Sequence, residues 1–359
     1  MKVIVVLLFT LPQTALAAWT VSPRVEFIQG SKKDISRRLV TNADFNLQGE
    51  NWLWSADAFF DVDFVTSETL RTRRGQSRAY LQELFFEWRI SSLYLRFGRQ
   101  PLRWSDSWIL PSLDLWTGRK WNRLLLDPLD EQLNHSSGIT AIWAGEDLSF
   151  EGAFIPEVAQ SQYPEPLPET FDKSEGTSGG LRIRRVSDGL NWSVVLGRAD
   201  RRDMLGFSLN TATDFAVPKL EVGELRDNTR ALSVSGEVQH FLSAGADIFV
   251  GNWTWQPQMT LVRSEDRFTS KERRSTIFYF SGSRSHRKHE WQWQFYRNQE
   301  LEDFYGSLEY RYALDQLQSF SGFVKNYQGS EKSPLFRSYS ELTGGWTVGV
   351  SYRLDLASK

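Results

Sequence analysis

The segment from Trp52 to Thr66, WLWSADAFFDVDFVT, alternates apolar and polar residues with a period of two. Its even-numbered positions are apolar, whereas Asp57, Asp61 and Asp63 lie between them. Such alternation predicts a strand with one apolar and one polar face. The pattern recurs along most of the chain, with almost no helical stretches between the repeats. One closed sheet that faces lipid outside and water inside accommodates every such strand at once.

The first residues predict export. Met1 and Lys2 give a short charged start, Val3 to Leu11 is an apolar run too short to span a bilayer, and Ala15-Leu16-Ala17 has the small residues of a cleavage site. We interpret residues 1–17 as a signal peptide, with the mature chain starting near Ala18. A membrane anchor is the less favoured interpretation, because an anchor needs roughly 20 apolar residues. No later apolar run approaches that length.

Composition agrees with a membrane barrel. The absence of Cys excludes a disulfide framework and thiol chemistry. A mean hydropathy of -0.42 is compatible with a barrel, since only alternate strand residues meet lipid. The 15 Trp and the aromatic content of 14% fit rings of aromatic residues at both membrane interfaces. A net charge of -2 gives no indication of a nucleic-acid partner.

The apolar parity resets at each turn, which predicts an all-β, transmembrane, antiparallel up-and-down barrel. We expect about 16 strands, within a range of roughly 14 to 18, in one domain from residue 18 to 359. Short links such as Gly49-Glu50-Asn51 and Phe241 to Ala244 alternate with longer ones, as in outer-membrane barrels. Leu205 to Leu209 and Phe215 to Val222 form either another hairpin or part of the long fifth loop. The predicted strands are 19–29, 37–48, 52–66, 77–90, 93–99, 137–144, 148–156, 180–186, 190–199, 229–241, 245–256, 274–283, 289–298, 303–313, 317–327 and 343–355.

Parity also assigns the two faces of the wall. A lipid-facing Arg near the midplane costs about 2 to 4 kcal/mol, which favours the lumen for the charged positions. Their alternative role is pairing across neighbouring strands to hold the wall together. The positions predicted to face lipid are Trp88, Ile90, Leu93, Leu95, Trp192, Val194, Trp291, Trp293, Trp346 and Val348. The positions predicted to face the lumen are Asp57, Asp61, Asp63, Glu83, Glu87, Arg89, Arg96, Arg182, Arg184, Glu237, Glu309, Arg311 and Arg353.

The longest link without a clear strand pattern, residues 99–136, is the third outer loop. Loops of this length are usually functional or disordered. Its Trp residues carry more apolar surface than a solvated segment would, so the loop must bury itself. The aromatic side chains either pack on the inner wall or offer stacking faces for sugars, and they are Trp104, Trp108, Trp116 and Trp121. The cations expected at a constriction are Arg99, Arg103, Arg119, Lys120 and Arg123.

A local resemblance supports this interpretation. Arg96-Phe97-Gly98-Arg99-Gln100, followed by Arg103-Trp104 and Leu113-Asp114-Leu115, is similar to a stretch of several Gram-negative outer-membrane proteins of porin-like type. The chain as a whole resembles bacterial porins in its pattern. This resemblance implies a third loop that folds into the barrel and narrows it. The chain departs from the usual aromatic last residue of barrel proteins, since it ends on Leu356-Ala-Ser-Lys359.

Catalytic sets are not evident. None of the four His residues sits in an interior strand next to a Ser with an Asp or Asn partner at the parity that a lipid-facing hydrolase would need. His286 and His289 lie in a basic turn, which favours solvated side chains over metal ligands at these positions. We therefore predict no enzyme, no metal and no cofactor.

The sequence predicts a porin-like channel in the bacterial outer membrane. Rings of charge select solutes by sign, and the basic balance of the long loop favours small polar or anionic solutes. The partners are then outer-membrane lipid and the solutes, with a homo-oligomer left open and no nucleic acid. The alternative is a plugged barrel with a structural, assembly or surface-polysaccharide role, and an outer-membrane hydrolase ranks last.

Overall fold

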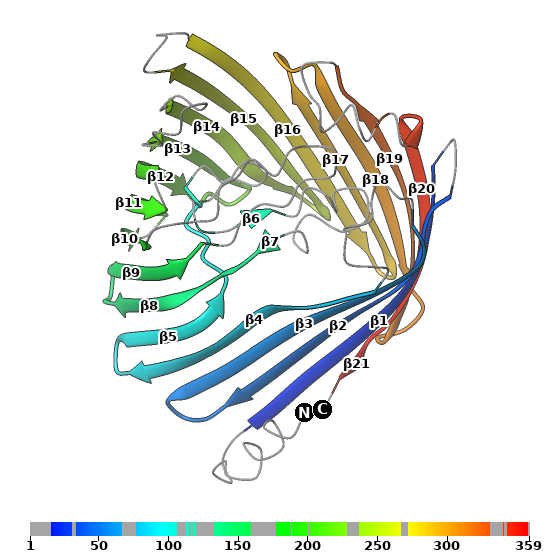
Figure 1. The fold of residues 1–359 in the computed structure, drawn as a ribbon, viewed down its shortest axis with the longest axis horizontal. Helices are drawn as coiled ribbons and strands as arrows, with labels where there is room; N and C mark the ends of the chain where they lie inside the picture. Colours follow the sequence, from blue (N-terminus) through cyan, green and yellow to red (C-terminus); the bar gives the residue numbers. More distant parts are fainter. Residues whose placement is uncertain are drawn as a thin grey trace.

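The computed structural model describes residues 16–30, 34–66, 77–105, 113–114, 116, 118–119, 133–158, 177–187, 189–199, 202–227, 237–266, 272–330, 340 and 343–357. These residues form a sheet that curls into a barrel, with both chain ends at one side (Figure 1). Within these ranges, no helix is long and apolar enough to cross a membrane.

Eighteen strands make up the wall in the part of the chain that is described. The first nine are β1 (Leu16–Gly30), β2 (Asp34–Gln48), β3 (Trp52–Thr66), β4 (Ser77–Ile90), β5 (Leu93–Gln100), β8 (Ser136–Ala144), β9 (Leu148–Glu157), β10 (Ser178–Ser187) and β11 (Leu190–Ala199). The others are β12 (Arg202–Thr211), β13 (Ala216–Asp227), β14 (Glu237–Val250), β15 (Trp253–Asp266), β16 (Glu272–His286), β17 (His289–Asn298), β18 (Asp303–Ala313), β19 (Gln318–Gln328) and β20 (Trp346–Leu354). The short β21 (Leu356–Ala357) follows β20 and also pairs with β1, whereas β6 (Gly118–Arg119) and β7 (Leu133–Asn134) form a separate two-stranded sheet.

The first and last wall strands close the barrel. β1 pairs antiparallel with β2 on one side and with β20 on the other, where Arg24 faces Arg353. β21 continues this seam by pairing Ala357 with Thr20. A closed ladder leaves no strand edge exposed to lipid. The predicted class, an all-β antiparallel up-and-down barrel, is therefore confirmed.

The strand count and the position of one predicted turn differ from the sequence prediction. β12 and β13 form the hairpin that the sequence left undecided, which raises the count from about 16 to eighteen. The short link predicted at Phe241 to Ala244 is wrong, because β14 runs through it and turns at Gly251, whose φ is 59°. Small residues around Gly245 resemble a turn in sequence, yet there they allow close approach to the backbone of β15.

The two ends of the barrel have connections of different length. On the side of the chain termini, every link has two to four residues; these links join β2 to β3, β4 to β5, β8 to β9, β10 to β11, β12 to β13, β14 to β15, β16 to β17 and β18 to β19. At the opposite end, the links β1–β2, β11–β12 and β17–β18 are as short, and the others are longer. The longest link at the opposite end joins β5 to β8. Short turns lie in the periplasm in barrels of this kind, so we call these ends the periplasmic end and the outer end.

Alternate side chains give the wall an apolar exterior. Outward positions such as Trp88, Leu205 and Val348 are 48%, 55% and 52% exposed, although they are large and apolar. The inward neighbours Glu87, Met204 and Thr347 are buried. An exposed apolar belt of this kind is stable only against lipid.

Candidate functional site: the lumen and its inward-packed loop

The long loop leaves the wall early. β5 has 8 residues, whereas its neighbour β4 has 14. At the departure point Gln100 is fully buried, donates to the Gly138 carbonyl at 3.2 Å and accepts from the Thr140 hydroxyl at 2.9 Å. The two-stranded pair β6–β7 of this loop lies within the ring of wall strands (Figure 1). The described residues of the link between β5 and β8 therefore lie in the lumen.

Apolar side chains attach the loop to the inner wall. Trp104 and Trp116 meet edge to face, with ring centroids 4.4 Å apart. They belong to a buried cluster that combines loop residues Leu102, Trp104, Leu113 and Trp116 with wall residues Ile155, Val158, Val195, Ala199, Met204 and Phe241. This is a hydrophobic core inside a barrel, and it fixes the loop on the side of β9 to β14.

Inward glycines make room for this cluster. A Cβ at Gly197 would lie 2.7 Å from Trp116 Cζ2, and one at Gly180 would lie 2.8 Å from the same ring. Gly206 is likewise covered by the side chain of Leu113. The wall thus has no side chain at the positions where Trp116 and Leu113 pack against it.

Polar contacts complete the attachment. Asp114 accepts hydrogen bonds from the backbone N–H groups of Trp104 and Ser105, which ties the two ends of residues 104–114 together. The Trp104 indole donates to Glu151 at 2.8 Å, and the Ser105 hydroxyl donates to Glu221 at 2.8 Å. Two wall carboxylates therefore bind the loop as acceptors of its polar groups.

Burial raises the pKa of the Asp114 carboxyl to about 7. Loss of hydration is the main cause, and it outweighs the backbone donors and the nearby Arg103 and Arg182, which favour the charged form. Asp114 lies in the loop, inside the lumen, and a pKa of about 7 means that it changes between its neutral and its charged form near neutral pH.

Three carboxylates form a row on the opposite inner surface. Asp44 faces Asp57 in the register of β2 and β3, and Asp57 faces Glu83 in that of β3 and β4. His135 Nε2 lies 3.5 Å from Glu83 Oε1, at the end of this row. Arg96 and Arg103 act on the charge of Glu83. This acidic row is therefore adjacent to the cations of β5 and of the loop.

The lumen cations belong to two groups. Arg96 and Arg89 both bind Glu87, at 2.7 and 2.8 Å, and Arg182 binds Glu151 at 2.6 Å. Arg103 and Arg184 are exposed instead. Among the described residues, no carboxylate lies within ion-pair distance of these two arginines.

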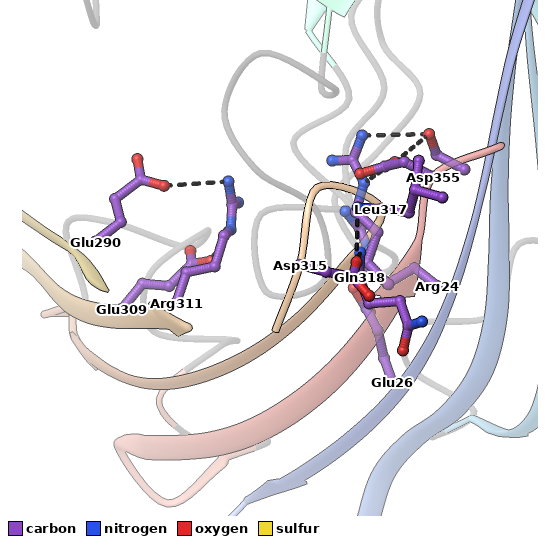
Figure 2. A network of polar contacts seen from close by, with 11 residues as sticks. Arg24, Glu26, Glu290, Glu309, Arg311, Asp315, Leu317, Gln318 and Asp355 are labelled. Carbon is purple, nitrogen blue, oxygen red and sulfur yellow. Dashed lines mark hydrogen bonds and ion pairs between the residues drawn. The ribbon is translucent and has the colours of Figure 1, made fainter. Parts of the chain in front are cut away.

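A second polar network lies toward the periplasmic end (Figure 2). Arg311 reaches Glu290 at 3.4 Å and Glu309 at 3.6 Å, and Arg24 binds Glu26 at 2.5 Å. The Ser22 hydroxyl donates to Asp355 at 2.6 Å across the seam. The Arg311–Glu290 and Ser22–Asp355 contacts join neighbouring segments of the wall, whereas Arg311–Glu309 and Arg24–Glu26 are pairs within one strand.

The structure brings together some predicted site residues and not others. Trp104 packs on Trp116, Arg96 binds Glu87, and Asp57 faces Glu83 in the strand register. Arg182 binds Glu151, which was not predicted, and Arg103 and Arg184 are exposed. Arg99 is half-buried and donates to the Gln82 carbonyl at 3.0 Å, and its register partner is the outward Leu84. For Arg119 and Asp61 only the backbone is described. Trp108, Trp121, Lys120 and Arg123 lie outside the described residues.

Several residues of this site were missed from the sequence. Glu151 and Glu221 stand at inward parity in β9 and β13, so strand alternation could have found them once the hairpin was assigned. No sequence signal identifies Gly197, which leaves room for Trp116, or Asp114, which accepts hydrogen bonds from two backbone N–H groups. Both roles depend on the path of the loop.

A closed barrel with an apolar exterior, a charged lumen and an inward-packed loop has the architecture of an outer-membrane porin. Similar solved structures are those of OccAB4 from Acinetobacter baumannii, with a TM-score of 0.63 at 10% identity, and of the outer membrane protein opdK from Pseudomonas aeruginosa, with 0.64 at 12%. Both alignments cover 96% of this chain and 99% of the other. OccD1 (OprD) gives 0.58 at 10% identity, covering 95% of each chain. These proteins are outer-membrane porins and not enzymes. No protein-family model and no curated protein sequence matches the chain.

A larger side chain at Gly197 should displace Trp116, and with it the loop, from the inner wall. We expect Gly197→Leu to increase tryptic cleavage within residues 101–135 and to lower stability by about 3 kcal/mol, because overpacking and lost Trp burial act together. The matched control is Gly152→Leu, whose Cβ would meet only Leu181 Cδ2, at 3.5 Å, on the outer face. Equal loop cleavage in the two variants would contradict the packing described here.

Asp114 should make loop stability depend on pH. Its folded pKa of about 7 exceeds the ordinary 3.8, so its favourable contribution is complete below about pH 4 and is lost as pH rises through 7. Asp114→Asn keeps an oxygen acceptor for both N–H groups and cannot ionise. The difference in Tm, variant minus wild type, should therefore grow from about pH 4 to about pH 8 in thermal unfolding in detergent. A difference that stays constant with pH would refute this assignment.

Proposed function

We propose that the protein is an outer-membrane channel for passive diffusion of small polar or anionic solutes, narrowed by its infolded third loop. The observation that carries the proposal is the attachment of the described loop residues 102–105, 113–114 and 116 to the inner wall. Their apolar side chains point into the buried cluster, and Arg103 stays exposed between them. A loop held in this way reduces the cross-section and presents charge to a passing solute.

The charge arrangement supports a preference for anions or for solutes with separated charges. Arg103 and Arg184 have no described ion-pair partner, whereas Arg96 and Arg182 are neutralised by Glu87 and Glu151. The acidic row of Asp44, Asp57 and Glu83 provides the opposite sign nearby. Fields of this kind select by charge at a constriction. OpdK, a protein of similar fold, has a structure with vanillate, which is a small anion.

A specific observation favours the second candidate function, a plugged barrel with a structural, assembly or surface-polysaccharide role. Trp116 and Leu113 are fully buried, so the loop fills the lumen on one side with tightly packed side chains. A wider filling of the lumen would close the channel and leave a membrane-embedded scaffold. Conductance separates the two candidates.

Planar-bilayer recordings of refolded protein should give stable conductance, and deletion of Arg103 to Leu126 should increase it severalfold because the obstruction is removed. The same deletion should accelerate swelling of liposomes in sugar solutions. A wild type without conductance and a deletion variant with conductance would support the plugged barrel. A folded barrel that never conducts in either form would contradict the channel.

Selectivity should depend on Arg184. One unit charge at about 8 Å in water contributes about 0.5 kcal/mol, roughly a twofold effect on ion permeability. We expect Arg184→Gln to lower the ratio of anion to cation permeability about twofold in reversal-potential measurements. Arg185→Gln is the matched control, since strand alternation places Arg185 on the outer face. An equal shift in both variants would mean that lumen charge does not set selectivity.

A further inference from the structure

Charged side chains interrupt the apolar exterior at the outer end of β11 to β16. All of them stand at outward parity, and Arg198, His240 and Arg263 stand two residues beyond the exposed apolar positions Leu196, Leu242 and Leu261. We call this group the outer charged belt. It consists of Arg198, Asp203, Glu224, Arg226, His240, Arg263, Glu265, Glu272 and Arg274.

Strand register places these residues side by side. Arg198 faces Asp203, which in turn faces Arg226. One row further toward the membrane, Glu224 faces His240, then Arg263 and then Arg274 on successive strands. The belt is thus continuous across six strands.

Weak ion pairs link the belt. Arg198 lies 3.7 Å from Asp203, Arg263 lies 3.3 Å from Glu272, and Arg226 binds Glu224. The side chains remain accessible, since those of Arg274 and Arg198 are 76% and 61% exposed. Exposed pairs of this kind contribute only about 0 to 1 kcal/mol. Their arginines can therefore exchange partners at little cost.

The height of the belt follows from the length of the apolar band. On β15 the outward residues are apolar from Trp253 to Leu261, and the next outward residue is Arg263. On β14 they are apolar from Leu242 to Val250, and the next is His240. A tilted strand crosses the hydrocarbon core in about 9 to 11 residues. The belt consequently lies at the boundary between hydrocarbon and head groups of the outer leaflet.

The chemistry of that boundary identifies the partner. The outer leaflet of the outer membrane consists of phosphorylated glycolipid bridged by divalent cations. Guanidinium groups bind phosphate through two parallel hydrogen bonds, and carboxylates such as Glu265 bind divalent cations. We propose that the outer charged belt is a binding surface for the phosphates of this glycolipid, lipid A, with Arg226, Arg263 and Arg274 as the main contacts.

The test compares lipids and variants of the full refolded chain. Native mass spectrometry of protein in detergent measures binding of diphosphorylated lipid A, fully dephosphorylated lipid A and phosphatidylglycerol, with and without Mg²⁺. The belt variant is R226Q/R263Q/R274Q. The matched control is R284Q/R287Q/K288Q, which removes the same charge at the periplasmic end. Heat-modifiable migration in gels verifies that each variant is folded.

We expect wild type and control to bind diphosphorylated lipid A equally and the belt variant to bind it at least tenfold more weakly. R226K/R263K/R274K should recover part of the loss, because the charge remains while two-point hydrogen bonding is lost. Equal binding of dephosphorylated lipid A, an equal loss in the control, or phosphatidylglycerol binding as tight as that of lipid A would each overturn the proposal.

Discussion

Every other feature of this protein depends on one requirement, which is that backbone N–H and C=O groups facing lipid have no water to bond. The ladder between β1 and β20 satisfies that requirement, because it removes the last open edge of the sheet. Once the sheet is closed, strand alternation alone separates an apolar exterior from a polar interior. The charges of the lumen, such as Glu87 and Arg96, then pair inside a space that lipid cannot reach.

The inner wall solves a different problem, which is how to hold an irregular segment inside a water-filled space. The apolar cluster around Trp104 and Trp116 gives the loop a small core of its own, and the wall glycines let that core sit close to the backbone. Carboxylates from β9 and β13 then fix its polar groups. The loop is held by packing and by hydrogen bonds together, so its position does not depend on charge alone.

The local sequence pattern predicted most of the architecture, because each strand by itself shows the two-residue alternation of apolar and polar side chains. The faces of Trp88 and Glu87 follow from parity without any knowledge of neighbours. The number of strands did not follow, since the hairpin of β12 and β13 is rich in small and polar residues and resembles a loop. The Trp content of the long loop predicted that the loop folds inward. Its packing of Trp116 against Gly197 arises from a contact between segments far apart in sequence, and its hydrogen bonds to Asp114 depend on how the loop folds back on itself. Such contacts produce no periodic pattern in the amino-acid sequence.

The seam between the two ends of the chain has a consequence for assembly. Ser22 and Asp355, which share a hydrogen bond, are 333 positions apart, so the joint cannot form until nearly all of the polypeptide has been made and delivered. Joining such distant segments carries a large loss of chain entropy that neighbouring hairpins do not face. Closure of the barrel is therefore a late step in folding, and until then the unpaired edges of the open sheet must be protected from association with other chains.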